Sequence, residues 1–305
     1  MGKNIIVSNR LPVQIKKEEE VWVFTPTSGG LATGMKSFHQ EGDSLWVGWP
    51  GIGSDKLDEV SREQIDTSLE KDSYKAVYLN EEELENFYFG LSNKCLWPLF
   101  HYFVEYHQFD TVQWEHYVAV NQKFADAVIA NLEDGDKVWI HDYQLLLCPQ
   151  MIKVVKPEVT IGFFLHIPFP SFEIFRIFPE REALLQGLLG ADLIGFHTYD
   201  YERHFLSSVK RILRLEVNFN VISYEGREVT VNTFPMGIDF KKFETAAHKN
   251  LSSESSESSE LKPYQEKLKF YLNQGNSFID YSCYEEFKDK ISFAQLERKE
   301  GLWNQ

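Results

Sequence analysis

Short apolar runs alternate along most of the chain with stretches whose apolar residues recur every three or four positions. The first pattern is typical of buried strands and the second of helices packed through one face. Strands joined by crossover helices form a parallel sheet with helices on both faces. The sequence therefore predicts a doubly wound, mostly parallel α/β sheet. We expect strands at 4–8, 45–49, 76–79, 138–140, 161–165, 193–196 and 230–234, and helices at 31–39, 81–88, 112–130, 143–155, 171–178, 181–189 and 201–213.

The alternation stops after Phe243. Residues 252–260 are consecutive Ser-Ser-Glu repeats, a composition typical of flexible linkers. The residues beyond them contain aromatics but no strand–helix alternation. We expect a ligand-binding domain at 1–243, a Ser/Glu-rich linker at 244–260, and a tail of short helices with no assigned role at 261–305.

The composition excludes several classes of partner. The chain has 31 Lys and Arg against 46 Asp and Glu, a net charge of -15, which disfavours nucleic acid and anionic membranes. Cys95, Cys148 and Cys283 are widely spaced and form no disulfide or zinc pattern. We expect no leader peptide, because the first residues enter an apolar strand pattern at once, and no membrane span, because no apolar run is long enough. We expect a soluble protein of the reducing cytoplasm.

Gly29 and Gly30 precede a predicted helix. Adjacent glycines there let the backbone approach a ligand closely and direct N–H groups at an anion. A turn that merely requires glycine fits equally well. The sequence contains neither a dinucleotide fingerprint nor a phosphate-binding P-loop.

Polar residues follow several of the predicted strands. Arg10 could bind an anionic ligand or form a structural salt bridge, and the sequence leaves both readings open. Asp142 could bind a ligand or cap the helix that follows. His166 precedes two prolines that fix the backbone, which favours a ligand contact, although a lone histidine is often a core residue. Doubly wound sheets bind ligands beyond the carboxyl ends of their strands, where these polar residues lie.

Aromatic residues form a further group of candidates. Trp49, Tyr88 and Trp97 lie near predicted turns or helix ends, and flat aromatic faces with polar tips suit the surface of a sugar. Each of them taken singly fits core packing as well. The spacing of His141, Asp142, His166 and His197 matches no metal-ligand motif, so we expect no metal site.

Taken together, these segments resemble the trehalose-6-phosphate synthases of glycosyltransferase family 20. These retaining enzymes join glucose from UDP-glucose to glucose 6-phosphate. The matching segments are IIVSNRLPV (5–13), SGGLATG (28–34), WVGWPG (46–51), SNKCLWPLFHY (92–102), YVAVNQ (117–122), VWIHDYQL (138–145), GFFLHIPFP (162–170), GFHT (195–198) and FPMGID (234–239).

The resemblance implies a GT-B fold, in which two Rossmann-like domains face each other across the active site. It also implies roles for particular residues. Arg10 would bind the acceptor phosphate, and Trp49, Tyr88, Trp97 and Asp142 would form the glucose 6-phosphate pocket. Gly29 and Gly30 would contact the nucleotide-sugar donor, and His166 would make a catalytic contact with the transferred glucose. Trp97 and Ile167 would govern anomer selectivity.

The resemblance implies catalysis without a cofactor or a metal. Positive groups stabilise the departing UDP, while the acceptor hydroxyl is held on the same face of the donor sugar. In the family, the charged residues that bind the donor pyrophosphate lie in a second α/β domain. The sequence after 239 resembles no such domain. We therefore expect this chain to supply the acceptor half and to lack useful catalysis alone.

Two kinds of function remain open at this stage. The chain could be the acceptor half of a synthase, active with a donor-binding partner chain or as a homo-oligomer. It could instead be a non-catalytic subunit that senses glucose 6-phosphate, or a truncated gene product. In each case the expected ligands are small molecules, glucose 6-phosphate and a nucleotide-glucose.

Overall fold

The computed structural model describes residues 2–235, apart from 20, 28–34, 36–38 and 40–42. Contacts divide the chain into one unit over Met1–Pro235 and a second over Met236–Gln305. The predicted linker and tail lie outside the described residues, and so does most of the helix predicted at 31–39. The domain boundaries inferred from the sequence therefore remain predictions.

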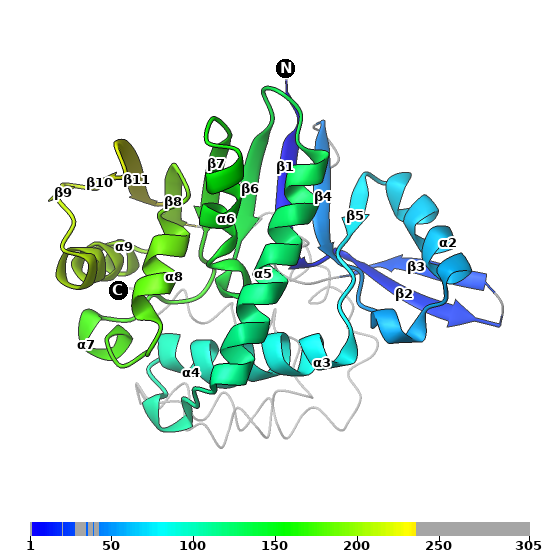
Figure 1. The fold of residues 1–305 in the computed structure, drawn as a ribbon, viewed down its shortest axis with the longest axis horizontal. Coiled ribbons are helices and arrows are strands. Elements are labelled where there is room, and N and C mark those ends of the chain that lie inside the picture. The colour runs from blue at the N-terminus through cyan, green and yellow to red at the C-terminus, as the bar shows by residue number, and fades with distance from the viewer. Residues whose placement is uncertain (1, 20, 28–34, 36–38, 40–42, 236–305) are drawn as a thin grey trace, which may run out of the picture. The chain divides into compact units, whose positions relative to one another are not determined.

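The described unit is built on a sheet of nine strands in the order β5-β4-β1-β6-β7-β8-β11-β10-β9 (Figure 1). The pairs from β5 to β11 are parallel, whereas β10 pairs antiparallel with both β11 and β9. This confirms the predicted doubly wound, mostly parallel sheet. The strands of this sheet are β1 (Asn4–Arg10), β4 (Ser44–Trp49), β5 (Tyr74–Ala76), β6 (Lys137–His141), β7 (Thr160–Phe164), β8 (Leu193–Phe196), β9 (Val217–Asn218), β10 (Val221–Tyr224) and β11 (Arg227–Thr233).

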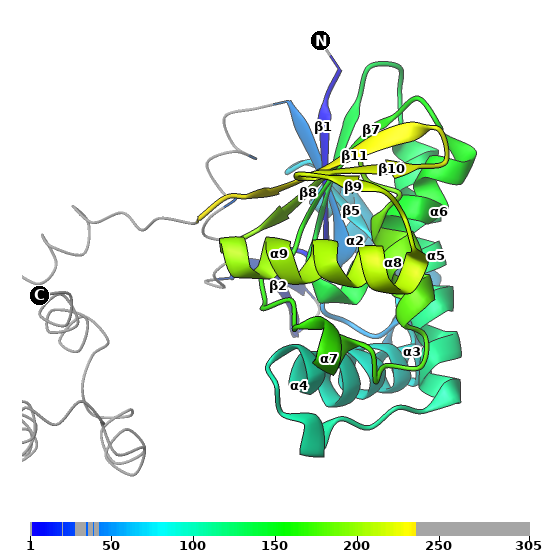
Figure 2. The same cartoon turned by 90° about the vertical axis from the view of Figure 1, so that its left-hand side faces the viewer.

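Successive side chains of the central strands enter two different hydrophobic cores. Ile5 and Val7 of β1 belong to the larger core, while Ile6 between them belongs to the smaller one. This follows from the alternation of side chains across a strand. Helices α5 (Thr111–Asn131), α6 (Cys148–Val155) and α8 (Arg181–Leu188) supply residues to the larger core and lie together on one side of the sheet (Figures 1 and 2).

The smaller core includes an element that the sequence did not predict, a two-stranded antiparallel hairpin of β2 (Val13–Glu18) and β3 (Val21–Pro26). Val13 and Ile15 of the hairpin are buried in one cluster with Ile65 and Leu69 of helix α2 (Glu59–Glu70), also unpredicted. In β2, only Val13 and Ile15 alternate with polar residues before a run of charged residues begins. This alternation is too short to indicate a strand from the sequence alone.

Most predicted helices exist, but several differ in extent. The helix expected at 81–88 is instead a continuous helical run over α3 (Glu81–Glu83), the π-helix η2 (Leu84–Leu96) and α4 (Trp97–Phe100). The strand expected at 76–79 lies earlier, as β5.

The helix expected at 143–155 is broken into η4 (Tyr143–Leu145) and α6, whose first turn contains Pro149. The remaining helical elements are η1 (Ser54–Lys56), η3 (Val104–Tyr106), α7 (Phe172–Phe175), α9 (Tyr199–Ser208) and η5 (Val209–Leu213).

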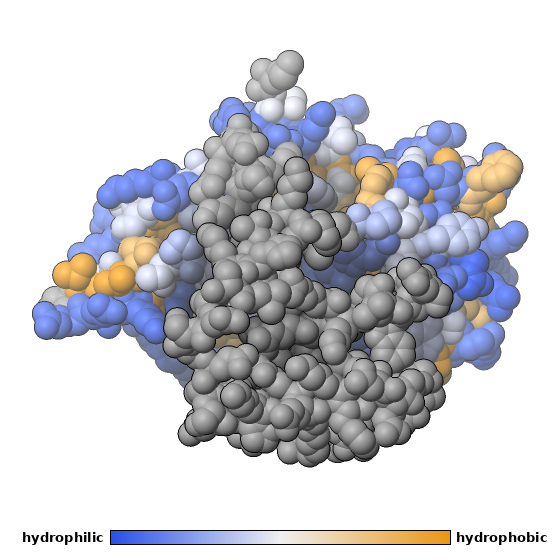
Figure 3. Space-filling model, turned by 180° about the vertical axis from the view of Figure 1, so that it is seen from behind, coloured by the Kyte–Doolittle hydropathy of each residue, from blue (hydrophilic) through white to orange (hydrophobic). Residues whose placement is uncertain are grey.

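Where described residues are visible from behind, their surface is mostly hydrophilic, with separate hydrophobic patches toward the two sides (Figure 3). Within the described residues, no helix is both long enough and apolar enough to span a membrane.

Candidate functional site

The sheet order places the polar strand ends side by side. The chain runs from β1 outward to β4 and β5, and then returns to the opposite side of β1 as β6. The strand order therefore reverses between β1 and β6, and the crevice beyond such a switch point is where doubly wound sheets bind ligands. Arg10 ends β1, and Asp142 directly follows β6.

Arg10 lies opposite Trp49 in the register of β1 with β4, and its guanidinium carbon stands 5.4 Å from the centroid of the Trp49 ring. The ring is held in place because its Nε1 donates to the carbonyl oxygen of Ile52 at 3.0 Å. Arg10 is exposed and forms no ion pair with a carboxylate in the described part of the chain. An exposed guanidinium stacked on an indole is well suited to bind an anion.

Gly51 makes room for this arrangement. Its φ is +89°, and a Cβ built there would come within 2.8 Å of Nη2 of Arg10. Glycine adopts this backbone conformation without strain. A larger residue at this position would displace the guanidinium.

Asp142 has a strained backbone, with φ 76° and ψ 170°, a region that essentially only glycine occupies. Its Oδ1 accepts hydrogen bonds from the backbone N–H of Tyr143 at 3.0 Å and of His166 at 3.2 Å. Burial raises the pKa of the carboxyl to about 6, although the bonds from Tyr143 and His166 act in the opposite direction. Within the described residues no hydrogen bond reaches Oδ2. The aspartate therefore does more than cap the following turn, since it ties the end of β6 to the segment after β7 and retains an acceptor oxygen.

His166 lies in a row of histidines at the ends of β6, β7 and β8. Its Nε2 is 3.0 Å from Nδ1 of His141, and its ring centroid is 5.6 Å from that of His197. Burial, and then the neighbouring His197, lower the pKa of His166 to about 4. Burial, and then His166, lower that of His141 to about 3. Both rings are therefore neutral at neutral pH.

Tyr88 lies on η2, partly buried against the larger core, and contacts Phe89 edge to face. Burial raises the pKa of the Tyr143 phenol, and Asp142 and then Tyr88 add to this rise electrostatically. The Tyr143 hydroxyl donates to Oδ1 of Asn93 at 2.8 Å. The place of Tyr88 in a pocket with Asp142 stays a prediction.

Trp97 is exposed at the start of α4, and its ring stacks on His101 with the centroids 4.0 Å apart. A second stacked contact joins it to Phe103. In the described part of the chain, no hydrogen bond or ring contact joins Trp97 to Arg10 or Asp142. The structure therefore does not place Trp97 in contact with the residues at the strand ends.

The remaining candidates differ in how far the structure describes them. Ile167 is partly buried against the larger core, next to His166 in the chain. Gly29 and Gly30 lie outside the described residues. Within those residues, no group of three or more His, Cys, Asp or Glu side chains could hold a metal ion.

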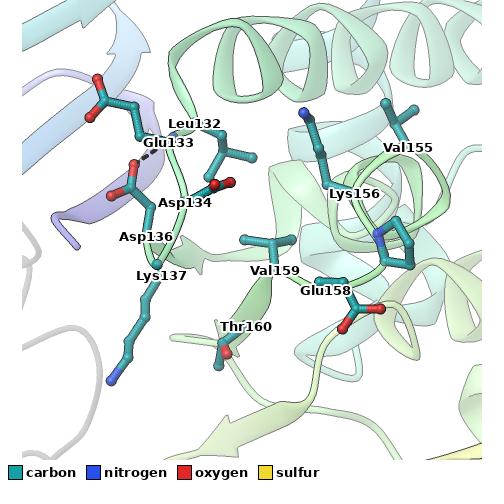
Figure 4. A pocket seen from close by; sticks show the side chains of 12 residues that line it. Leu132, Glu133, Asp134, Asp136, Lys137, Val155, Lys156, Glu158, Val159 and Thr160 are labelled. Atoms are coloured by element: carbon teal, nitrogen blue, oxygen red, sulfur yellow. Dashed lines mark hydrogen bonds between the residues drawn. The ribbon is translucent and has the colours of Figure 1, made fainter. Parts of the chain in front are cut away.

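A hollow of about 360 Å³ lies at the amino ends of the strands, where the loops preceding β6 and β7 meet (Figure 4). Leu132, Asp134, Lys137, Lys156 and Thr160 are among the residues that line it. It contains none of the residues predicted from the sequence, and it lies at the amino ends of the strands rather than at the switch point.

The sequence reasoning missed two features of this site. One is the backbone conformation of Asp142, for which no sequence signal exists. The other is the hydrogen bond between His141 and His166. The spacing of both histidines at the ends of neighbouring predicted strands could have indicated their proximity.

A doubly wound, mostly parallel sheet with polar residues at its switch point defines the chain as a Rossmann-like α/β protein. The sequence profile described as "Glycosyltransferase family 20" matches residues 2–274. The chain therefore belongs to glycosyltransferase family 20, which confirms the resemblance inferred from the sequence.

Individual relatives agree. The chain is 44% identical over 254 residues to the alpha,alpha-trehalose-phosphate synthase [UDP-forming] of Pichia angusta, a match covering 79% of this chain and 53% of that protein. It is 45% identical over 251 residues to the 56 kDa subunit of the corresponding enzyme of Kluyveromyces lactis, covering 79% of this chain and 51% of that protein. The chain thus spans about half the length of the curated relatives it matches.

Solved structures give the same result. An alpha,alpha-trehalose-phosphate synthase (UDP-forming) from Burkholderia vietnamiensis superposes with a TM-score of 0.71 at 27% identity, over 87% of this chain and 54% of that one. The N-terminal domain of the trehalose-6-phosphate phosphatase of Candida albicans superposes with a TM-score of 0.69 at 31% identity, over 89% and 55% of the two chains. An E. coli relative described as bound with UDP-2-fluoro glucose superposes with a TM-score of 0.67 at 29% identity, over 89% and 55%.

Proposed function

We propose that this chain provides the acceptor-binding half of an alpha,alpha-trehalose-phosphate synthase, which transfers glucose from UDP-glucose to glucose 6-phosphate with retention. The observation that carries the proposal is the geometry of Arg10. An exposed guanidinium stands on Trp49 at the switch point and has no carboxylate partner within the described residues. A phosphate there would gain charge-assisted hydrogen bonds from the guanidinium.

The sugar of glucose 6-phosphate would lie between Arg10 and Asp142. Asp142 retains Oδ2 as an acceptor for sugar hydroxyls, since its other hydrogen bonds fall on Oδ1. Tyr88 would close the side of the pocket next to Tyr143, and Trp49 would offer an aromatic face to the sugar. We assign Trp97 and Ile167 a role in anomer selectivity on the resemblance alone.

The donor would bind beside this pocket. Gly29 and Gly30 would direct backbone N–H groups at the nucleotide-sugar, and His166 would contact the transferred glucose. Because the pKa of His166 is lowered to about 4, its ring would act as a neutral hydrogen-bonding group rather than as a cation. No cofactor or metal has a part in this scheme.

The test is release of UDP from UDP-glucose in the presence of glucose 6-phosphate, compared between the wild-type protein and Arg10→Ala. The chain alone should release no UDP. Turnover that depends on glucose 6-phosphate once a donor-binding partner chain is added, with the Michaelis constant for glucose 6-phosphate raised about 10-fold or more in the variant, supports the proposal. Turnover indifferent to Arg10→Ala contradicts the assigned site. Binding of glucose 6-phosphate without turnover, even in the presence of a donor-binding partner chain, identifies the sensor function instead.

A further inference from the structure

His166 is held from three directions. Its ring Nε2 faces Nδ1 of His141, and its backbone N–H donates to Asp142. Its ring also meets the ring of His197 edge to face, with the centroids 5.6 Å apart. Within the described residues, only His141 forms a hydrogen bond with a ring nitrogen of His166, so only His141 can select which of these nitrogens carries the proton.

The contact between the two rings requires one donor and one acceptor. A neutral imidazole carries a single N–H, and its other nitrogen is a hydrogen-bond acceptor. Both rings are neutral at neutral pH, as their lowered pKa values of about 3 and 4 indicate. Either His141 donates from Nδ1, or His166 donates from Nε2.

The second ring nitrogen of His141, Nε2, decides between these arrangements. Its Nε2 is buried and has no hydrogen-bond partner within the described residues. If His166 were the donor, His141 would carry its proton on Nε2, and a buried N–H would be left unpaired. If His141 is the donor, Nε2 is a bare lone pair, which is the less costly of the two orphan groups.

We propose that His141 is a positioning residue, which donates from Nδ1 to Nε2 of His166 and holds His166 as the Nδ1–H tautomer. His166 then offers a hydrogen-bond donor, and no basic nitrogen, from the side of its ring that faces away from His141. Within the described residues, Nδ1 of His166 makes no hydrogen bond, so this N–H remains for a ligand. That use rests on the proposed function, in which an oxygen of the transferred sugar would accept it, whereas the tautomer itself does not.

The direct test is the tautomer of His166, read from two-bond proton–nitrogen correlation spectra of the full chain labelled with ¹⁵N-histidine, at neutral pH and without ligand. The His166 signals are identified by their loss in His166→Gln. The proposal predicts a protonated Nδ1 and a bare Nε2. A protonated Nε2 in the wild-type protein would overturn it.

Two variants of His141 test the cause. His141→Asn keeps an N–H donor close to the position of Nδ1, and the Nδ1–H tautomer should persist. His141→Phe keeps an aromatic ring beside Trp139 but removes the donor, and His166 should change to the Nε2–H form that free imidazole side chains prefer in water. If His166 keeps its tautomer in a folded His141→Phe variant, the proposal is wrong. If that variant does not fold, the wild-type and His141→Asn spectra still decide.

His197→Phe is the matched control. It removes a histidine whose ring lies against that of His166 but forms no hydrogen bond with its ring nitrogens within the described residues, so the tautomer should stay unchanged. A change of tautomer in this variant would assign the role to His197 and overturn the proposal. Since these spectra need no substrate, failure of the synthase function and failure of this inference are separate results.

Discussion

The guanidinium of Arg10 is held above the ring of Trp49 at 5.4 Å, directly beside a glycine at φ +89°. A Cβ at Gly51 would stand 2.8 Å from Nη2 of Arg10. We expect Gly51→Ala to displace the guanidinium and to weaken binding of glucose 6-phosphate about 10-fold or more, as loss of a charged hydrogen bond would. Calorimetric titration measures this change.

Gly226→Ala is the matched control for that variant. Gly226 also has a positive φ, +77°, but a Cβ there meets nothing within 4 Å. Both variants should lose about 1 kcal/mol of stability from backbone strain. Only Gly51→Ala should bind glucose 6-phosphate more weakly, and equal affinities in the two variants would contradict the assigned role of Arg10.

Substitutions of Asp142 should separate its effect on the free energy of unfolding from its effect on glucose 6-phosphate binding. Asp142→Asn keeps an oxygen that can accept from Tyr143 and His166, so we expect its unfolding free energy to stay within about 1 kcal/mol of wild type. Because the charged acceptor is lost, binding of glucose 6-phosphate should weaken about 10- to 100-fold.

Asp142→Ala should behave differently in urea unfolding. It leaves two backbone N–H groups without their acceptor and should cost about 1–3 kcal/mol. Equal stability of the Ala and Asn variants would show that these hydrogen bonds do not hold the strained turn together.

The buried histidine predicts a pH dependence of stability. The pKa of His141 is lowered to about 3 in the folded protein, whereas a histidine in the unfolded chain has a pKa of about 6.5. As the pH falls below about 6.5, the unfolded chain therefore becomes protonated at His141 while the folded protein does not. His141 therefore destabilises the fold increasingly toward acid, by up to about 1.4 kcal/mol per pH unit. Asp142, whose pKa is raised to about 6, acts in the opposite direction as the pH falls from there toward its unfolded value.

Comparison of wild type with His141→Asn separates the two groups, because Asp142 is common to both proteins. From pH 6.5 to pH 5, the unfolding free energy of wild type should fall relative to that of the variant by up to about 2 kcal/mol. Urea unfolding at several pH values measures it. Parallel pH profiles would show that His141 is not a buried neutral base.

Asp192 directly precedes β8, at the amino ends of the strands and away from the candidate site. Its carboxylate accepts from Nζ of the buried Lys153 at 2.9 Å and from the backbone N–H of Ile161 at 2.7 Å, with Arg227 3.6 Å away. Asp192→Asn leaves the lysine charge poorly paired. Allowing for the partial exposure of Asp192, we expect a loss of about 2 kcal/mol in urea unfolding. Affinity for glucose 6-phosphate should not change, and a matching loss of affinity would contradict the separation of site and scaffold.

The periodicity of the sequence was enough to predict the central sheet, because its strands are continuous apolar runs buried on both faces. The strand at 193–196 was predicted with the bounds that the structure has. The β2–β3 hairpin was missed because its partners in the smaller core, such as Ile65, are distant in the sequence. Tertiary packing, rather than local propensity, makes these residues a hairpin.

At the candidate site, the sequence indicated which strand ends carry polar residues but not how their side chains interact. The positive φ of Asp142 depends on hydrogen bonds that include one to His166, 24 positions later. The pairing of His141 with His166 likewise depends on the register of β6 with β7. Trp97 was predicted as a pocket residue from its type and from the resemblance, and that role remains a prediction.

The central claim is that Arg10 binds the phosphate of an acceptor sugar, and its most direct measurement is a pair of calorimetric titrations, with glucose 6-phosphate and with glucose. Wild type should prefer glucose 6-phosphate to glucose, and Arg10→Ala should lose about 10- to 100-fold of that preference. Its affinity for glucose should stay nearly unchanged. No binding of glucose 6-phosphate by the wild-type chain, or a preference for the phosphate that survives Arg10→Ala, would contradict the account.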